Sequence, residues 1–335
     1  MVVHAQEDDF GCGPVDSGFV NVNGIRLYFE VYGEGEPLLL VEGLGYSTWM
    51  WFKQVLDLSS RHRVIVFDNR GVGYSDKPDE EYSIELMASD AAGLLKELEV
   101  ERAAVLGVSM GGFIAQQLAL DYPDVVSGLI LVCTAQEGVK NDGTNAWRMI
   151  LKTLDIVPGA LELAVSLCGK ASGNIPLTPF ADPVYNMRRA LSFGFTNEYF
   201  GSHPDEIDRI FKWRLANPQP TYAWKRQFSA GLEFDASERV GEISVPTLVI
   251  AGAGDRIIPI ESSGRLAEQI PSSQFVQLPD AGHLLFIEQA ELFNKAVLDF
   301  LSQVYGDEPE LEKEEIREAP GKSLWQKFQG WIMNT

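Results

Sequence analysis

Six short, unbroken apolar segments constrain the fold of this chain more than any other feature of its sequence. They cover residues 38–41, 64–67, 103–106, 129–132, 247–251 and 275–278. Strands that are apolar along their whole length are typical of a parallel sheet, because helices cover both faces of such a sheet. The six segments therefore predict a mostly parallel central sheet.

Helical periodicity between these segments predicts the helices that flank the sheet. They are expected over residues 47–58, 84–98, 111–122, 261–269 and 290–304, and Ser83 is placed to cap the second of them. Ahead of the first apolar segment, Asn23-Gly24 separates two alternating stretches, which predicts a β-hairpin over residues 18–32. A hairpin followed by alternating strands and helices indicates an α/β fold with right-handed crossovers.

The alternation stops between residues 136 and 242. This segment is helix-like and aromatic, and it contains Trp147, Trp213 and Trp224. An insertion of this size between strands predicts a helical lid over a binding site. The expected organisation is an N-terminal tail (1–17), a core (18–135 and 243–304), the lid (136–242), and an acidic linker with a C-terminal amphipathic helix (305–335).

The chain is strongly acidic, with 27 Lys and Arg against 48 Asp and Glu and a net charge of −21. Such a surface repels phosphates, so no nucleic-acid partner is expected. The inserted segment is nearly balanced, with 12 basic and 13 acidic residues, and therefore does not exclude an anionic substrate.

Three widely spaced cysteines, Cys12, Cys133 and Cys168, predict neither a disulfide framework nor a zinc site. We expect them to be small buried side chains in a reducing cytoplasm. No apolar stretch is long enough to cross a bilayer, and the first 13 residues are polar and acidic, unlike a signal peptide. These features predict a soluble, cytoplasmic protein.

The motif that carries chemistry is Gly107-Val-Ser-Met-Gly111, which lies directly between an apolar segment and a predicted helix. G-x-S-x-G between a strand and a helix is typical of a nucleophile elbow. The glycines leave room for neighbouring backbone, and the turn presents Ser109 at a helix N-terminus that favours a developing anion. Ser109 is therefore the predicted nucleophile.

A serine hydroxyl needs a base, and the base needs a third group that orients it. His283 follows the last predicted strand, and Asp255 closes the loop Ala251-Gly-Ala-Gly-Asp255 after the preceding strand. Ser109, Asp255 and His283 thus follow three strands, at the edge where open α/β sheets bind ligands. The alternative base is His203 in the inserted segment, whereas His4 and His62 lie in the N-terminal tail and before a strand.

Together these motifs resemble the α/β-hydrolase fold superfamily over residues 19–304, closest to its esterase and enol-lactonase-like branch. Asp68-Asn-Arg-Gly-Val-Gly-Tyr-Ser75 is similar to the D-x-R-G-x-G-x-S loop of that superfamily. The resemblance implies that Asp68 and Arg70 hold loops beside the site. It also implies an oxyanion hole made by the backbone N–H groups of Met110 and Leu44.

The chain departs from the superfamily at Glu42-Gly43, where His-Gly is common. Two roles for Glu42 follow. Its carboxyl group turns away and hydrogen-bonds loop backbone, as the histidine would. Alternatively it faces the pocket as a substrate-binding group, where it repels an oxyanion unless it is protonated, or positions a water or a polar substrate.

The expected activity is hydrolysis of a small carboxylic ester or lactone by a serine hydrolase. The sequence contains no metal, nucleotide or NAD motif, so no cofactor is expected. The same triad serves C–C bond hydrolases, thioesterases, acyltransferases and cofactor-free perhydrolases. A different class, a ligand receptor with slow turnover, uses the same fold.

Two further regions have open roles. Trp147, Trp213 and Trp224 either line an acyl pocket or pack the lid onto the body. The cations of the lid either face solvent or include one that binds a carboxylate; they are Arg188, Arg189, Lys212, Arg214, Lys225 and Arg226. The C-terminal helix has an apolar face that docks on its own body, forms a homodimer contact, or, least favoured, binds a membrane surface.

Overall fold

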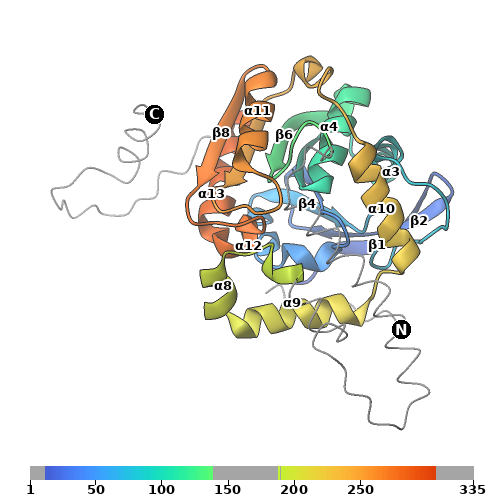
Figure 1. Ribbon diagram of the computed structural model, residues 1–335. Helices are drawn as coiled ribbons and strands as arrows, with labels where there is room; N and C mark the ends of the chain where they lie inside the picture. Colours follow the sequence, from blue (N-terminus) through green and yellow to red (C-terminus); the bar gives the residue numbers. More distant parts are fainter. Residues whose placement is uncertain (1–11, 139–187, 189, 307–335) are drawn as a thin grey trace, which may run out of the picture.

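The computed structural model is built around an eight-stranded sheet with helices on both faces (Figure 1). The structure describes residues 12–138, 188 and 190–306. The strands lie in the order β1-β2-β4-β3-β5-β6-β7-β8. They are β1 (Asp16–Val22), β2 (Ile25–Tyr32), β3 (Glu36–Val41), β4 (His62–Phe67), β5 (Ala103–Val108), β6 (Val126–Val132), β7 (Thr247–Gly252) and β8 (Ser273–Leu278).

The sheet is parallel from β4 to β8 in its spatial order, and only β1 and β2 run antiparallel to their neighbours. Each of the six apolar segments lies within one of the strands β3 to β8, so the predicted mostly parallel sheet is confirmed. The hairpin is confirmed as well. Asn23 and Gly24 have φ angles of 48° and 79°, as a tight two-residue turn between twisted strands requires.

Four of the five predicted helices are present. Ser83 caps the first of them, because its Oγ accepts the N–H of Leu86 at 3.1 Å. A short helix that precedes the last of them, α12 (Leu285–Glu288), was not predicted. The four helices are α3 (Ile84–Glu97), α4 (Met110–Asp121), α11 (Ile260–Gln269) and α13 (Ala290–Tyr305).

The single helix predicted over residues 47–58 is wrong. The structure has a 3₁₀ helix, η1 (Thr48–Trp51), and one separate turn, α2 (Val55–Leu58). Hydrogen bonds with α13 and α12 explain the break. Asn294 Nδ2 of α13 donates to the carbonyl of Lys53 at 2.7 Å, and Gln54 Nε2 donates to the carbonyl of Phe286 in α12 at 2.6 Å. Tertiary contacts therefore override the helical propensity of this segment.

Separate apolar cores cover the two faces of the sheet, which explains the unbroken apolar segments. In β3, Leu39 and Val41 belong to the core that α3 and α4 cover, whereas Leu38 and Leu40 belong to the core that α13 covers. All four side chains are fully buried. A central strand therefore shows no apolar–polar alternation.

The described part of the insertion includes α8 (Asn197–Ser202), α9 (Pro204–Ala216) and α10 (Thr221–Glu233), and a short turn, η4 (Val240–Glu242), follows them. In Figure 1, α8 lies beside α12. The domain boundaries and the lid role stay predictions, and Trp147 and the C-terminal helix lie outside the described residues. Within the described ranges, no helix is long and apolar enough to span a membrane.

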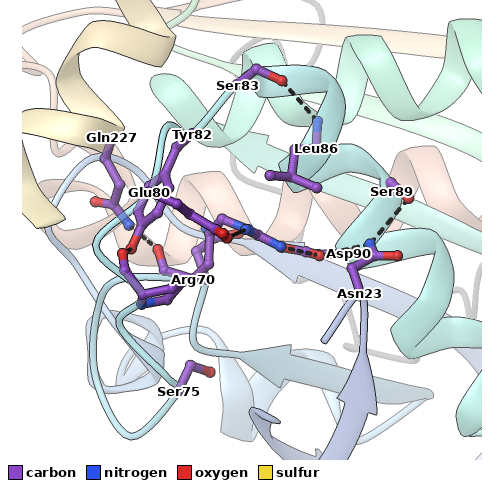
Figure 2. A network of polar contacts seen from close by, with 12 residues as sticks. Asn23, Arg70, Ser75, Glu80, Tyr82, Ser83, Leu86, Ser89, Asp90 and Gln227 are labelled. Atoms are coloured by element: carbon purple, nitrogen blue, oxygen red, sulfur yellow. Dashed lines mark hydrogen bonds and ion pairs between the residues drawn. The ribbon is translucent and has the colours of Figure 1, made fainter. Parts of the chain in front are cut away.

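A buried ion pair joins the hairpin, the loop after β4, and α3 (Figure 2). Arg70 Nε and Nη2 donate to the two carboxylate oxygens of Asp90 at 2.6 and 2.9 Å, and both side chains are 1% exposed. Asn23 Nδ2 donates to Asp90 Oδ1 at 2.8 Å, and Gln227 Nε2 from α10 donates to the carbonyl of Arg70 at 2.8 Å. The Arg70–Asp90 pair thus connects the hairpin, the loop after β4, α3 and α10.

Replacement of one partner of this ion pair tests its contribution to stability. Arg70→Met leaves the Asp90 carboxylate buried without a counter-charge, and we expect the free energy of unfolding to fall by about 3–5 kcal/mol in urea denaturation. The double variant Arg70→Met/Asp90→Asn removes the uncompensated charge and is expected to regain part of this loss. A double variant no more stable than Arg70→Met would contradict the explanation.

Candidate active site

A sharp turn places Ser109 between β5 and α4. Its backbone has φ 57° and ψ −119°, and its N–H donates to the carbonyl of Val132 at 2.9 Å. A Cβ atom at Gly107 would lie 2.2 Å from the carbonyl oxygen of Gly111, and one at Gly111 would lie 2.2 Å from that of Val41. Both glycines of the motif are therefore required by close backbone contacts.

The hydroxyl of Ser109 does not cap α4, although the residue occupies the N-cap position. The side chain is thus not used for helix capping, and it stands where the backbone N–H groups and the helix dipole favour negative charge. A left-handed φ at a serine costs energy and is typical of functional sites.

The second part of the site is a hydrogen-bonded pair. His283 Nδ1 lies 2.8 Å from Asp255 Oδ2, and the two side chains are 8% and 1% exposed. The other carboxylate oxygen, Oδ1, accepts the N–H groups of Ile257 and Ile258 at 2.7 and 2.9 Å. Because a carboxylate accepts hydrogen bonds, the tautomer of a neutral imidazole that suits this contact has its proton on Nδ1 and a lone pair on Nε2.

These residues share one edge of the sheet, since β5, β6, β7 and β8 are parallel neighbours and each residue follows the carboxyl end of its strand. The structure therefore brings Asp255 and His283 into contact and places Ser109 at the same edge. His203, the alternative base, instead stacks on Tyr199 in the insertion, with ring centroids 3.9 Å apart. Its ring belongs to the contacts of α8.

Sequence reasoning missed Glu288, which holds the histidine loop. Glu288 Oε1 accepts the N–H groups of Gly282 and Thr196 at 3.0 and 3.1 Å, and Oε2 accepts the Thr196 hydroxyl at 2.7 Å. Gly282 precedes His283 directly, and Thr196 is the N-cap of α8. One carboxylate thus ties the histidine loop to the insertion, a role that only its spacing after His283 could have indicated.

The loop after β3 lies against Ser109. A Cβ atom at Gly43 would be 3.4 Å from the Cβ of Ser109, so the backbone on either side of Gly43 is close to the nucleophile motif. The N–H of Gly45 donates to Gln227 Oε1 at 3.2 Å, which fixes the far end of the loop to α10. This placement suits the expected donors, the N–H groups of Leu44 and Met110, whose role stays a prediction.

The sequence of this chain matches a known protein family over most of its length. A sequence model described as the alpha/beta hydrolase fold matches residues 36–290. The chain belongs to the α/β-hydrolase fold family. This agrees with the resemblance found in its motifs.

Three relatives of this hydrolase illustrate the range of the family. A protein of Variovorax paradoxus that is named as a carbamate hydrolase, RutD, is 32% identical over 83% of this chain and 97% of the relative. BpoC of Mycobacterium tuberculosis, named as a non-heme bromoperoxidase, is 28% identical over 84% and 99%. The solved structure of an enol-lactonase from Burkholderia xenovorans LB400 has a TM-score of 0.71 and 27% identity, covering 85% of this chain and 100% of that one.

In this hydrolase, the carboxyl group of Glu42 contacts the loop after β4. Its Oε1 accepts the N–H of Asn69 at 2.6 Å, and the side chain is fully buried. The carboxyl group therefore hydrogen-bonds loop backbone. Burial, together with the nearby carboxylate of Asp68, raises the pKa of Glu42 well above its ordinary value.

Asp68 is the second buried carboxyl group in these loops. It accepts the N–H of Thr48 at 2.8 Å and that of Tyr74 at 2.7 Å, which joins the start of η1 to the loop after β4. Burial raises the pKa of Asp68 to about 7, although these hydrogen bonds lower it. The contacts agree with the loop-holding role that the resemblance implied.

The tryptophans of the insertion contact the body. The Trp213 ring lies 5.8 Å from Trp49 and 5.1 Å from Phe52 between centroids, so it packs α9 onto η1 and the residue after it. Trp224 is 8% exposed, and a Cβ atom added at Gly45 would lie 3.3 Å from its Cδ1. Trp213 thus packs the insertion onto the body, and Trp224 lies beside the loop that contains Leu44.

Most described cations of the insertion have local partners or face solvent. Arg188 pairs with Asp208, and Arg226 with Asp79 at 3.5 Å. Two arginines instead lie over aromatic rings, Arg214 at 4.7 Å from the centroid of Tyr46 and Arg209 at 4.8 Å from that of Phe52. Lys212 and Lys225 are exposed, and Arg189 lies outside the described residues.

The raised pKa of Glu42 predicts a pH-dependent stability difference. In the unfolded chain Glu42 has an ordinary pKa of about 4.3. Above this pH the unfolded chain loses the Glu42 proton, whereas the folded protein still holds it. Folding stability therefore falls as pH rises above that value. Glu42→Gln keeps an acceptor for Asn69 and removes this effect, so its melting temperature should exceed that of the wild type at pH 8 and approach it towards pH 4. A difference independent of pH would contradict the assignment.

The hydrogen bonds of Glu288 predict a role in positioning His283. Glu288→Ala leaves the N–H groups of Gly282 and Thr196 without their acceptor, and a displacement of the imidazole by about 1 Å lowers kcat of hydrolysis by roughly 10- to 100-fold. The matched control is Thr196→Val, which loses the hydroxyl contact but keeps the Glu288–Gly282 bond and should retain most of kcat. Equal losses in both variants would argue against positioning through Gly282.

Proposed function

We propose that this chain is a serine hydrolase that cleaves a small carboxylic ester or lactone through an acyl-enzyme intermediate. The observation that carries the proposal is the hydrogen bond between Asp255 and His283 at the sheet edge where Ser109 occupies its strained turn. A nucleophile, a base and a group that orients the base are the minimum for this chemistry.

In the proposed mechanism, Ser109 Oγ attacks the carbonyl carbon and His283 Nε2 takes the hydroxyl proton. Asp255 stabilises the imidazolium that forms and keeps its Nδ1 directed away from the substrate. The N–H groups of Met110 and Leu44 stabilise the tetrahedral oxyanion. His283 then protonates the leaving alcohol and activates a water molecule that releases the acyl group, which restores the enzyme.

The relatives support ester or lactone cleavage without fixing the substrate. One is titled an enol-lactonase and one is named a carbamate hydrolase. Lactone hydrolysis and carbamate hydrolysis both add water to a carbonyl carbon that is bonded to a heteroatom. A second candidate is a perhydrolase activity that uses the same triad, and the relative named as a bromoperoxidase supports it. A product analysis with and without hydrogen peroxide separates the two activities.

A ligand receptor with slow turnover is the candidate function of another class. It depends on the unusual Glu42 at this position of the loop, and slow single turnover with tight ligand retention would support it. The cytoplasmic location remains part of the proposal. Its support is that Cys12 and Cys133, the cysteines among the described residues, are both free.

Replacement of the nucleophile tests the proposal directly. We expect the wild type to react with a fluorophosphonate at Ser109 and to hydrolyse p-nitrophenyl butyrate, and Ser109→Ala to lose both, with kcat reduced by roughly four orders of magnitude or more. Peptide mass spectrometry locates the label, and circular dichroism shows whether the variant is folded. A folded wild type that neither reacts nor turns over these probes, or a variant with unchanged turnover, would refute a Ser109 hydrolase.

A further inference from the structure

A buried thiol lies beside the Asp255–His283 pair. Cys133 is the first residue after β6, has φ 47° and is fully buried. Its Sγ, a carboxylate oxygen of Asp255 and a ring nitrogen of His283 all lie within 4.8 Å of one another. Among the described residues, this is the group of His, Cys, Asp and Glu side chains close enough to share a metal ion.

The proposed mechanism gives this sulfur no task. A buried cysteine is ordinarily a small apolar side chain, but here the thiol has a carboxylate as a neighbour. Burial and the adjacent Asp255 raise the pKa of the Cys133 thiol well above its ordinary value. The sulfur is thus a buried soft donor within 4.8 Å of possible ligand atoms of Asp255 and His283.

We propose that Cys133, Asp255 and His283 form an inhibitory site for a thiophilic divalent cation such as Zn²⁺. One sulfur, one imidazole nitrogen and one carboxylate oxygen form a ligand set typical of zinc. Zn–S bonds of about 2.3 Å and Zn–N and Zn–O bonds of about 2.0–2.2 Å separate neighbouring ligand atoms by about 3.3–3.6 Å. The observed separations, from 2.8 Å up to 4.8 Å, reach these values with shifts on the order of 1 Å.

The neighbouring groups limit which atoms bind. Asp255 Oδ1 is held by the N–H groups of Ile257 and Ile258, so Oδ2 is the oxygen that faces the ion. Glu288 is occupied by Gly282 and Thr196 and does not supply a ligand. With three protein ligands, the site leaves a fourth position for water. Mg²⁺ and Ca²⁺ prefer six or more oxygen ligands and are not expected to bind.

Binding has a defined proton balance. The thiol of Cys133 loses its proton to water as the metal–sulfur bond forms. The proton on His283 Nδ1 moves to Nε2, so that the Nδ1 lone pair binds the ion. The imidazole then has no free nitrogen to accept the Ser109 proton, and hydrolysis stops. This last consequence rests on the proposed function, whereas the ion binding does not.

The first test measures binding without activity. Cd²⁺ titration of the full chain, in a Cys12→Ser/Cys168→Ser background, should give an ultraviolet thiolate-to-metal charge-transfer band that saturates at one ion per chain. Cys133→Ser keeps a hydroxyl of similar size but removes the soft ligand, so the band should vanish and the affinity should fall at least about 100-fold. Cys133→Ala serves as the second variant if the serine variant fails to fold. An unchanged band in either variant, or no band in the parent, overturns the proposal.

The second test measures the ratio of hydrolysis rates with and without Zn²⁺. The parent should lose activity at micromolar Zn²⁺ and regain it with EDTA, with no loss in Mg²⁺, and the ratio should rise towards one in Cys133→Ser. Equal inhibition of parent and variant overturns the site. Cadmium binding by a chain that does not hydrolyse esters would refute the proposed function and leave the metal site standing.

Discussion

Parallel pairing of β5, β6, β7 and β8 is the constraint on which the rest of the site depends. Because these strands point the same way, the residues that follow them, Ser109, Cys133, Asp255 and the His283 loop, meet at one edge. Backbone hydrogen bonds also fix the positions of Ser109 and Cys133. The N–H of Ser109 donates to β6 and the N–H of Cys133 donates to β7, so each residue is fixed by the adjacent strand.

The loops around this edge hold buried carboxyl groups in two physically different ways. Asp90 is paired with Arg70, and its two oxygens match the guanidinium. Burial raises the pKa of all three carboxyl groups. The contacts with Arg70 oppose that rise in Asp90, whereas backbone N–H groups oppose it in Glu42 and Asp68. The carboxylate of Asp68 adds to burial in raising the pKa of Glu42, because two adjacent buried negative charges repel each other.

The sequence predicted the features that depend on local pattern and missed those that depend on distant contacts. Apolar segments and the Asn23-Gly24 turn identify the strands because burial and backbone conformation act residue by residue. The break in the 47–58 helix could not be predicted, since it comes from Asn294 on a helix far along the chain. For Glu42, the sequence left two roles open, and the bond from the Asn69 N–H to its Oε1 joins residues too far apart in the chain for a local pattern to indicate.

The insertion and the catalytic loops share hydrogen bonds, which bears on how a substrate is selected. Glu288 connects Thr196 to the residue before His283, and Arg256, next to Asp255, donates to the carbonyl of Phe195 at 2.7 Å. Phe195 and Thr196 of the insertion are therefore held by the same two loops that carry His283 and Asp255. A movement of these residues strains the Asp255–His283 geometry directly, because no flexible linker separates them. A substitution at Phe195 or Thr196 can therefore alter the geometry of the Asp255–His283 pair.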